Sequence, residues 1–226
     1  MYNFGDYGGG STSTVKVSSN KLGSGGIYRS VLKRLVDVAL VALASPIVFT
    51  TIAILALVIR RDGGPAFYGQ KRVGRDGEIF TCWKLRTMVV DAESKLAAYL
   101  ENNAGARVEW EQTQKLKNDP RITPFGRIAR KTSLDELPQL WNILVGEMSL
   151  VGPRPIMPSQ QAMYHGTAYY DMAPGLTGFW QVSERNESTF ASRVGFDNRY
   201  ARELTFLTDV KILLRTVSVV LRGTGY

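Results

Sequence analysis

The segment RKTSLDELPQLWNILVGEMSLVGPRP, residues Arg130–Pro155, carries two adjacent carboxylates inside a frame of leucines and one tryptophan. These carboxylates are Asp135 and Glu136. Basic residues flank the pair on both sides, with Arg130 upstream and Arg154 downstream. Carboxylates beside arginines are typical of sites that bind phosphate groups and divalent cations. We therefore expect this segment to carry the chemistry and the rest of the chain to position it.

The spacing Ser133-x-x-Glu136 matches a capping box, in which the serine and the glutamate cap the same helix N-terminus. Pro138 limits where such a helix begins, because proline is tolerated only in the first turn. We expect a helix that runs to about Val145, with Ser133 or Asp135 as its cap. Both carboxylates would then lie at the positive end of the helix dipole, which favours their ionised forms. This placement suits a nucleophile or a metal ligand, and it suits an ordinary cap equally well.

The sequence VGPRP, residues 151–155, sets two prolines around a single arginine. The prolines restrict the backbone on both sides of Arg154 before any ligand binds. A preset guanidinium matches the oxygens of a phosphate group and loses little entropy on binding it. Together with the acidic pair, this sequence favours phosphate chemistry over a plain helix cap.

The chain has 226 residues, of which 44% are hydrophobic, and this is enough for one sizeable core with a membrane element attached. Its net charge of +8 and its isoelectric point near 9.6 indicate an anionic partner, whether nucleic acid, lipid head groups or a phosphorylated substrate. Cys82 and His165 are the only residues of their types. A disulfide within the chain and metal sites built from several cysteines or histidines are therefore excluded.

Three regions differ in composition. Residues 1–30 are rich in glycine and serine and predict a disordered arm. Residues 31–61 contain the uncharged run Val38–Ile59, which as a helix would extend about 33 Å and cross a bilayer core. Residues 62–226 have the composition of a folded domain, which we expect to lie in the cytoplasm.

Pro46 interrupts the apolar run, and its ring is incompatible with a straight helix. We expect Ser45 to donate a hydrogen bond to the carbonyl of Ala42, which the proline leaves free. Basic residues flank the run on both sides, among them Lys33 and Arg34, which are expected at the membrane interface. Because both ends then prefer the cytoplasmic side, a re-entrant helix is favoured over a kinked spanning helix.

Two β-prone runs around the turn Gly74–Gly77 predict a small hairpin. Lys84 and Arg86 are two residues apart in its second strand and would share one face, which is either solvated or available to phosphate. Residues Leu204–Leu221 have apolar side chains at helical spacing and three basic residues. They suit a C-terminal helix at the membrane interface or one packed on the core. The expected fold class is α+β and predominantly helical.

In residues Ser133–Pro155, SLDELPQLWNILVGEMSLVGPRP, the chain resembles the bacterial sugar transferases, also called monotopic phosphoglycosyl transferases. The resemblance extends from about Lys33 to the C-terminus. Members of this family transfer a sugar-1-phosphate from a UDP-sugar to undecaprenyl phosphate at the cytoplasmic face of the bacterial inner membrane, with Mg²⁺. The resemblance therefore implies a UDP-sugar donor, an undecaprenyl phosphate acceptor, the lipid bilayer and Mg²⁺ as partners.

The resemblance also implies roles for particular residues. Asp135 would be the nucleophile that carries the phosphosugar, and Glu136 would position the metal ion together with Asp135. Lys84 and Arg86 match a basic pair of the family. We expect them to bind phosphate together with the arginines that flank the acidic pair, Arg130 and Arg154.

Two further parts of the chain match the family. Lys33, Arg34, Asp37 and the Ser45-Pro46 break match its re-entrant helix. Residues Glu109–Pro120 and the small size of the chain resemble the members that initiate exopolysaccharide synthesis, which implies galactose or glucose as the sugar.

Two other functions compete with this one. A non-enzymatic basic module that binds lipid or nucleic acid would explain the charge and the apolar run, but not Asp135 and Glu136 beside Arg154. A glycosyltransferase that moves the sugar without its phosphate commonly uses Asp-x-Asp for its metal, and the chain has none. We therefore expect an enzyme that works on a membrane and binds no nucleic acid. A homodimer is compatible with the sequence, which does not decide the oligomeric state.

Overall fold

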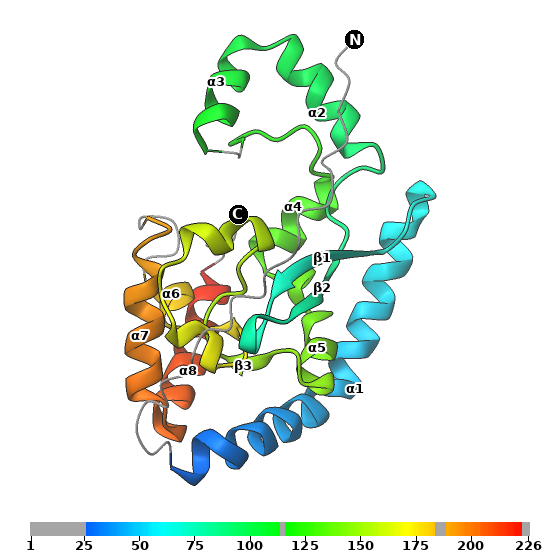
Figure 1. Cartoon of the computed structure of the whole chain (residues 1–226). Helices are drawn as coiled ribbons and strands as arrows, with labels where there is room; N and C mark the ends of the chain where they lie inside the picture. Colours follow the sequence, from blue (N-terminus) through cyan, green and yellow to red (C-terminus); the bar gives the residue numbers. More distant parts are fainter. Residues whose placement is uncertain (1–25, 114–115, 184–188, 223–226) are drawn as a thin grey trace.

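The computed structural model describes residues 26–113, 116–183 and 189–222, and Figure 1 shows their arrangement. The expected class, mostly helical with one small hairpin, is confirmed for these residues. Most of the arm predicted to be disordered, residues 1–25, lies outside the described residues. The helices are α1 (Lys33–Ile59), α2 (Ala92–Glu101), α3 (Ala104–Thr113), α4 (Pro124–Lys131), α5 (Gln139–Val145), α6 (Phe179–Val182), α7 (Arg193–Glu203) and α8 (Phe206–Leu221). The strands are β1 (Phe67–Val73), β2 (Ile79–Leu85), β3 (Ser149–Val151) and β4 (Gly175–Thr177).

Helical structure begins slightly before α1, with a π-helical turn at Tyr28–Leu32. The predicted boundary between the arm and the membrane element was residue 31, so the helix starts earlier than expected. The Tyr28 hydroxyl donates to Asp209 Oδ2 at 2.7 Å, and its ring packs edge-on against Phe206 with the ring centroids 5.9 Å apart. These contacts with α8 hold residues that their composition alone would leave disordered.

The helix α1 bends where Pro46 was predicted to break it, as Figure 1 shows. Ser45 Oγ donates to the carbonyl oxygen of Ala42 at 2.8 Å, which confirms the predicted hydrogen bond. The acceptor that proline leaves without a backbone donor is therefore satisfied within the helix itself. The re-entrant path through a bilayer stays a prediction.

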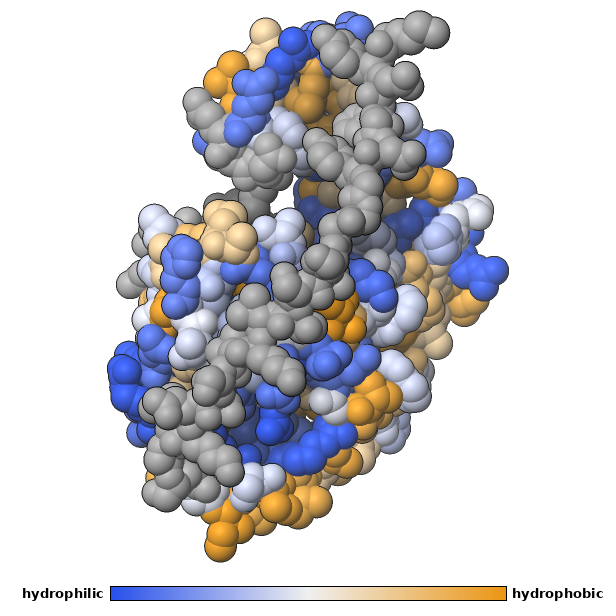
Figure 2. Space-filling view, viewed as in Figure 1, coloured by the Kyte–Doolittle hydropathy of each residue, from blue (hydrophilic) through white to orange (hydrophobic). Residues whose placement is uncertain are grey.

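The segment Tyr28–Asp62 is the one described helix that is long and apolar enough to cross a membrane. Only 11% of its most apolar 18-residue window is buried, which distinguishes it from the core helix of a soluble protein. Leu43 and Ile47, on either side of the bend, are 80% and 76% exposed. Figure 2 shows apolar residues along the lower edge and the right side of the molecule, where α1 runs in Figure 1.

Polar contacts hold the first turns of α1 on the rest of the chain. The Lys33 amine donates to Asp209 Oδ2 at 2.7 Å, and the two side chains are only 13% and 6% exposed. Asp37 accepts hydrogen bonds from Ser149 Oγ at 2.7 Å and from the backbone N–H of Leu150 at 3.2 Å. The helix is therefore fastened to α8 and to β3.

Arg34 donates to the carbonyl oxygens of Ile143 and Leu144 at the end of α5. Cations are favoured there because the last carbonyls of a helix have no partner within it. Lys33 and Arg34 were both expected at the membrane interface, and both have partners within the protein. Their contact with lipid head groups stays a prediction.

The strands β1 and β2 form the predicted antiparallel hairpin, with Phe67 opposite Leu85. Its turn holds Asp76 at φ 56° and Gly77 at φ 83°, in the left-handed region that aspartate and glycine tolerate better than most residues. A second sheet, the parallel pair β3 and β4, was not predicted. Just after β3, Gly152 passes so close to Ala173 that a Cβ atom would lie 2.5 Å from its carbonyl oxygen.

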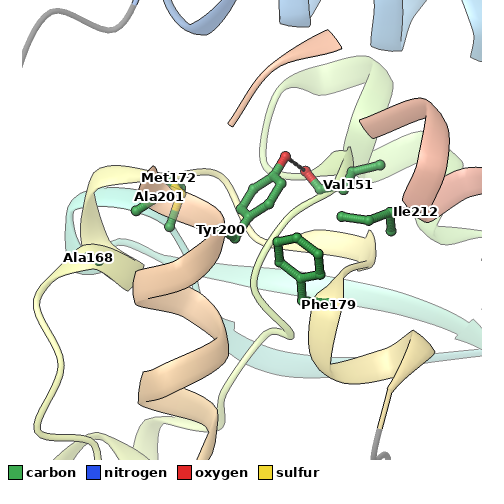
Figure 3. Packing of buried hydrophobic residues seen from close by; sticks show 7 residues of the cluster. All are labelled: Val151, Ala168, Met172, Phe179, Tyr200, Ala201 and Ile212. Carbon is green, nitrogen blue, oxygen red and sulfur yellow. Dashed lines mark hydrogen bonds between the residues drawn. The ribbon is translucent and has the colours of Figure 1, made fainter. Parts of the chain in front are cut away.

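The C-terminal helices close a core around Tyr200 (Figure 3). The Tyr200 hydroxyl donates to the carbonyl oxygen of Val151 at 3.1 Å and contacts Asp209 Oδ1 at 2.7 Å. This core joins β3 to α7 and α8. The buried members are Val151, Ala168, Met172, Phe179, Tyr200, Ala201 and Ile212.

The helix α8 presents two different sides. Ile212 is buried in the core, whereas Leu207, Leu214 and Leu221 are each more than 60% exposed and recur at helical spacing. This division fits the predicted C-terminal interface helix, and its contact with a bilayer stays a prediction.

We predict that Lys33→Met lowers the free energy of unfolding by about 3 kcal/mol, because Asp209 stays buried after losing its cation. Denaturant unfolding of the detergent-purified protein, followed by tryptophan fluorescence, measures the change. Lys211→Met is the matched control, since Lys211 is exposed on the same helix as Asp209. Equal stabilities of the two variants would contradict the anchoring role of Lys33.

Candidate active site

Asp135 and Glu136 lie on a single 3-10 turn, Leu134–Glu136, between α4 and α5. The capping-box prediction was wrong. An N-cap residue needs an extended backbone, whereas Ser133 lies in the left-handed region at φ 57°, and within the described residues its side chain makes no cap hydrogen bond. The helix α5 begins only at Gln139. The left-handed serine reverses the chain after α4 and turns the acidic pair toward β2.

Lys84 on β2 faces both carboxylates. Its Nζ atom lies 2.7 Å from Glu136 Oε1 and 3.9 Å from Asp135 Oδ2. Asp135 is only 8% exposed. Burial raises the pKa of the Asp135 carboxyl to about 6, while attraction to Lys84 acts in the opposite direction. A buried acid beside a lysine is a candidate reactive group rather than a surface ion pair.

Arg130 approaches Asp135 from α4. Its Nε atom donates to Thr87 Oγ1 at 2.9 Å, and its charge opposes the rise in the pKa of Asp135. The helix reaches this place because Gly126 packs directly on the backbone of Thr87. A Cβ atom at Gly126 would lie 2.0 Å from the Thr87 carbonyl oxygen, so only glycine fits. The predicted residue Arg130 is therefore brought to the acidic pair by tertiary packing.

A small pocket opens beside Glu136 and Lys84, and Arg154 lines it as well. The structure thus brings three of the predicted site residues together. It adds Arg72 on β1, which no sequence motif marks. Arg72 donates to the carbonyl oxygen of Pro155 at 3.1 Å and so holds the end of the VGPRP loop against the hairpin.

Arg86 does not line this pocket. Its guanidinium donates to Asp62 Oδ1 and to the carbonyl oxygen of Ile59, at the C-terminal end of α1. Arg86 is therefore not brought to the pocket with the other predicted residues, and its contact with phosphate stays a prediction. The partner of Arg86 is the carboxylate of Asp62, three residues after the predicted apolar run ends at Ile59, and the sequence alone did not indicate this pair.

A further arginine lies behind the VGPRP loop. Arg193, the first residue of α7, stacks over the Trp180 ring with its Cζ atom 4.3 Å from the ring centroid, and Arg154 lies 5.5 Å from the same centroid. Asp197, one turn along α7, accepts a hydrogen bond from the Tyr164 hydroxyl at 2.6 Å. No local sequence pattern marks Arg193, since the packing of α7 against α6 brings it here.

The acidic pair alone does not make a complete metal site. The described residues contain no group of three or more histidine, cysteine, aspartate or glutamate side chains that could hold an ion. Mg²⁺, however, commonly takes one or two carboxylates and completes its coordination with water and substrate phosphates. Asp135 and Glu136 fit that pattern when a phosphorylated substrate supplies the remaining oxygens.

The family model described as bacterial sugar transferase matches residues 28–223. The undecaprenyl-phosphate galactose phosphotransferase of Salmonella typhimurium is 50% identical over 200 residues, which are 86% of this chain and 41% of that protein. The exopolysaccharide production protein ExoY of Sinorhizobium fredii is 40% identical over 203 residues, 89% of this chain and 88% of that protein. The UDP-glucose:undecaprenyl-phosphate glucose-1-phosphate transferase of Escherichia coli is 34% identical over 202 residues, 82% of this chain and 39% of that protein. The chain thus spans less than half the length of the Salmonella and Escherichia proteins.

We predict that Asp197→Asn raises the apparent melting temperature at pH 7.5 and has little effect at pH 4. Burial raises the pKa of Asp197 from 3.8 to about 6, so the native state loses stability as the pH rises through this window. Asparagine carries no charge and keeps an acceptor for the Tyr164 hydroxyl.

Differential scanning fluorimetry across this pH range measures the gap between variant and parent. Asp76→Asn is the control, because the Asp76 side chain is 73% exposed. A variant that is less stable than the parent at pH 7.5 would mean that attraction to Arg193 outweighs the cost of burial.

Proposed function

The chain belongs to the bacterial sugar transferase family, and we propose that it is a phosphoglycosyl transferase acting on a UDP-sugar and undecaprenyl phosphate. It moves a hexose-1-phosphate to the lipid phosphate and releases UMP. This reaction is the first membrane step of exopolysaccharide synthesis. The observation that carries the proposal is the buried carboxylate of Asp135 beside Lys84, which lines a pocket together with Arg154.

The reaction proceeds in two displacements. A carboxylate oxygen of Asp135 attacks the phosphorus that bears the sugar, and the bond from this phosphorus to the bridging oxygen breaks. The bonding electrons leave with the UMP phosphate. An oxygen of the lipid phosphate then attacks the same phosphorus, and Asp135 departs as a carboxylate. The enzyme thus carries the phosphosugar as a covalent intermediate, so the nucleotide donor and the lipid phosphate do not have to react with each other directly.

The environment of Asp135 suits a nucleophile. With a pKa of about 6, the carboxyl is mostly ionised at neutral pH, and burial leaves it with little competing hydration. Its approach to an anionic phosphate needs positive charge nearby, which Lys84 and Arg130 supply. We propose Mg²⁺ as the cofactor, held by Glu136 and Asp135 with substrate oxygens, where it would neutralise charge on the diphosphate.

The acceptor explains why the enzyme needs a membrane helix. A polyprenyl phosphate keeps its tail in the bilayer, so the enzyme has to bring its reactive group to the surface of the membrane. We propose that α1 enters and leaves the cytoplasmic leaflet of the bacterial inner membrane by the same face, with the bend at Pro46 as its deepest part. The exposed side of α8 would lie along the same surface.

The sugar is galactose or glucose in this proposal. The Salmonella relative is named for galactose and the Escherichia relative for glucose. A donor comparison is therefore part of the first experiment. A homodimer stays a prediction, because a single chain is described.

We predict that the detergent-purified protein, given Mg²⁺ and UDP-galactose or UDP-glucose without lipid acceptor, gains the mass of one phosphohexose. The adduct forms because the first displacement does not require the acceptor. Intact-protein mass spectrometry detects it, and the accompanying UMP is measured by chromatography. The sugar that gives the larger adduct identifies the donor.

Two variants accompany this measurement. Asp135→Asn removes the nucleophile and should give neither adduct nor UMP, whereas Asp76→Asn, at the exposed hairpin turn, should behave as the parent. An adduct of equal yield on Asp135→Asn would assign the nucleophile to another residue. Absence of UMP release with every UDP-sugar, combined with retained binding to anionic lipid, would favour the binding-module function instead.

A further inference from the structure

Three arginines, Arg72, Arg154 and Arg193, lie close enough to repel one another. Arg72 and Arg154 line the pocket that also contains Glu136 and Lys84. Arg154 and Arg193 stack on the same tryptophan ring, so their guanidinium groups lie within the roughly 10 Å over which charges interact in 0.1 M salt. The three residues come from β1, from the VGPRP loop and from α7. Their charges therefore meet only in the folded chain.

None of the three arginines forms an ion pair with a carboxylate within the described residues. Glu136 lines the same pocket and attracts Arg72, but its carboxylate pairs with Lys84. Asp197 attracts Arg193, but its carboxylate accepts the Tyr164 hydroxyl. Arg193 Nε is buried and has no hydrogen-bond partner within the described residues. Burial and repulsion by Arg154 together lower the pKa of Arg193 to about 10.

A cluster of this kind is stabilised when an anion enters it, because the anion replaces repulsion with charge-assisted hydrogen bonds. The stacking of Arg193 on Trp180, and on Phe190 with Cζ 4.8 Å from that ring centroid, restricts the guanidinium in advance. Little side-chain entropy is then lost on binding. The Nε atom of Arg193, which is buried and has no partner among the described residues, supplies a donor that is already removed from water.

The position of the cluster indicates which phosphate it takes. Tyr200, two turns along α7 from Arg193, reaches Asp209, which also binds Tyr28 at the start of α1. Arg193 lies at the opposite end of α7, away from the start of the membrane helix, as Figure 1 shows. A water-soluble nucleotide can approach that side, whereas the head group of a lipid enters from α1.

We propose that Arg193, together with Arg72 and Arg154, binds the phosphate that remains with the nucleoside when the diphosphate is cleaved. This inference rests on the proposed function, and Arg193 is its new element. Negative charge grows on that phosphate as the bond to the bridging oxygen breaks. Guanidinium groups fixed around it stabilise the leaving group without having to reorganise.

Isothermal titration calorimetry with UMP and with inorganic pyrophosphate tests the proposal, using full-length protein in nanodiscs and EDTA to remove metal ions. Arg193→Gln should weaken the binding of both ligands by roughly tenfold or more. Arg193→Lys should recover part of the loss, because it keeps the charge. Arg199→Gln is the matched control on the same helix. Arg199 is exposed, stacks on Phe179 and pairs with Glu203.

A short-chain polyprenyl phosphate forms the second arm of the experiment. Its affinity should be the same for the parent and Arg193→Gln. Loss of affinity for the lipid phosphate alone would place the acceptor at this cluster and overturn the proposal. Unchanged affinity of Arg193→Gln for UMP and pyrophosphate would also overturn it and give Arg193 a purely structural role. Thermal unfolding confirms that each variant is folded, and a misfolded Arg193→Gln leaves the comparison to Arg193→Lys, which should still bind UMP more weakly than the parent.

The binding experiment with Arg193→Gln and the adduct experiment test the anion site and the transferase reaction separately. Weaker UMP binding by Arg193→Gln, in a protein that never forms a phosphohexose adduct, would support the anion site and reject the transferase reaction. A normal adduct together with unchanged UMP affinity in Arg193→Gln would support the transferase and reject the anion site.

Discussion

The helix α1 buries Val41, Ile52 and Ile59 against the rest of the protein, but apolar contacts are not directional, and polar side chains in its first turns fix its orientation. Lys33 pairs with Asp209 on α8, and Asp37 bonds to Ser149 and Leu150 on β3. These groups are removed from water, so each must keep its partner or stability falls. Because the partners lie on two different elements, the contacts select one orientation of the long helix, and the positions of β3 and of the loop after it follow from that orientation.

The site combines acidic and basic side chains that lie on separate elements of the fold. The carboxylates arrive on one 3-10 turn, whereas the cations come from β2, α4, β1 and the VGPRP loop. This division suits a nucleophile that has to approach an anion. Lys84 and Arg130 lie beside Asp135 and offset its charge, while Arg72 and Arg154 line the pocket in which the proposed substrate would bind. The same arrangement keeps a buried acid ionised near neutral pH.

Local signals made much of this fold predictable. The bend at Pro46, the bond from Ser45 and the hairpin turn at Asp76 each depend on a few consecutive residues, and each is present. The acidic pair and its cations Lys84, Arg130 and Arg154 were also identified from the sequence.

Features that depend on distant packing were not predictable in this way. Ser133 has a left-handed conformation and does not form the expected helix cap, and Arg86 forms an ion pair with Asp62. Arg72 and Arg193 lie in segments without a recognisable motif, and only tertiary packing brings them beside Arg154.

The hydrogen bond from Leu150 to Asp37 couples the position of α1 to that of the loop that carries Arg154. Between that bond and Arg154 lie Gly152, which is tightly packed against Ala173, and Pro153, whose ring restricts the backbone. This short segment therefore has little freedom to bend. If α1 lies in a bilayer as proposed, tilting this helix would move the Arg154 guanidinium, and the thickness of the bilayer would then affect where this arginine lies relative to the acidic pair.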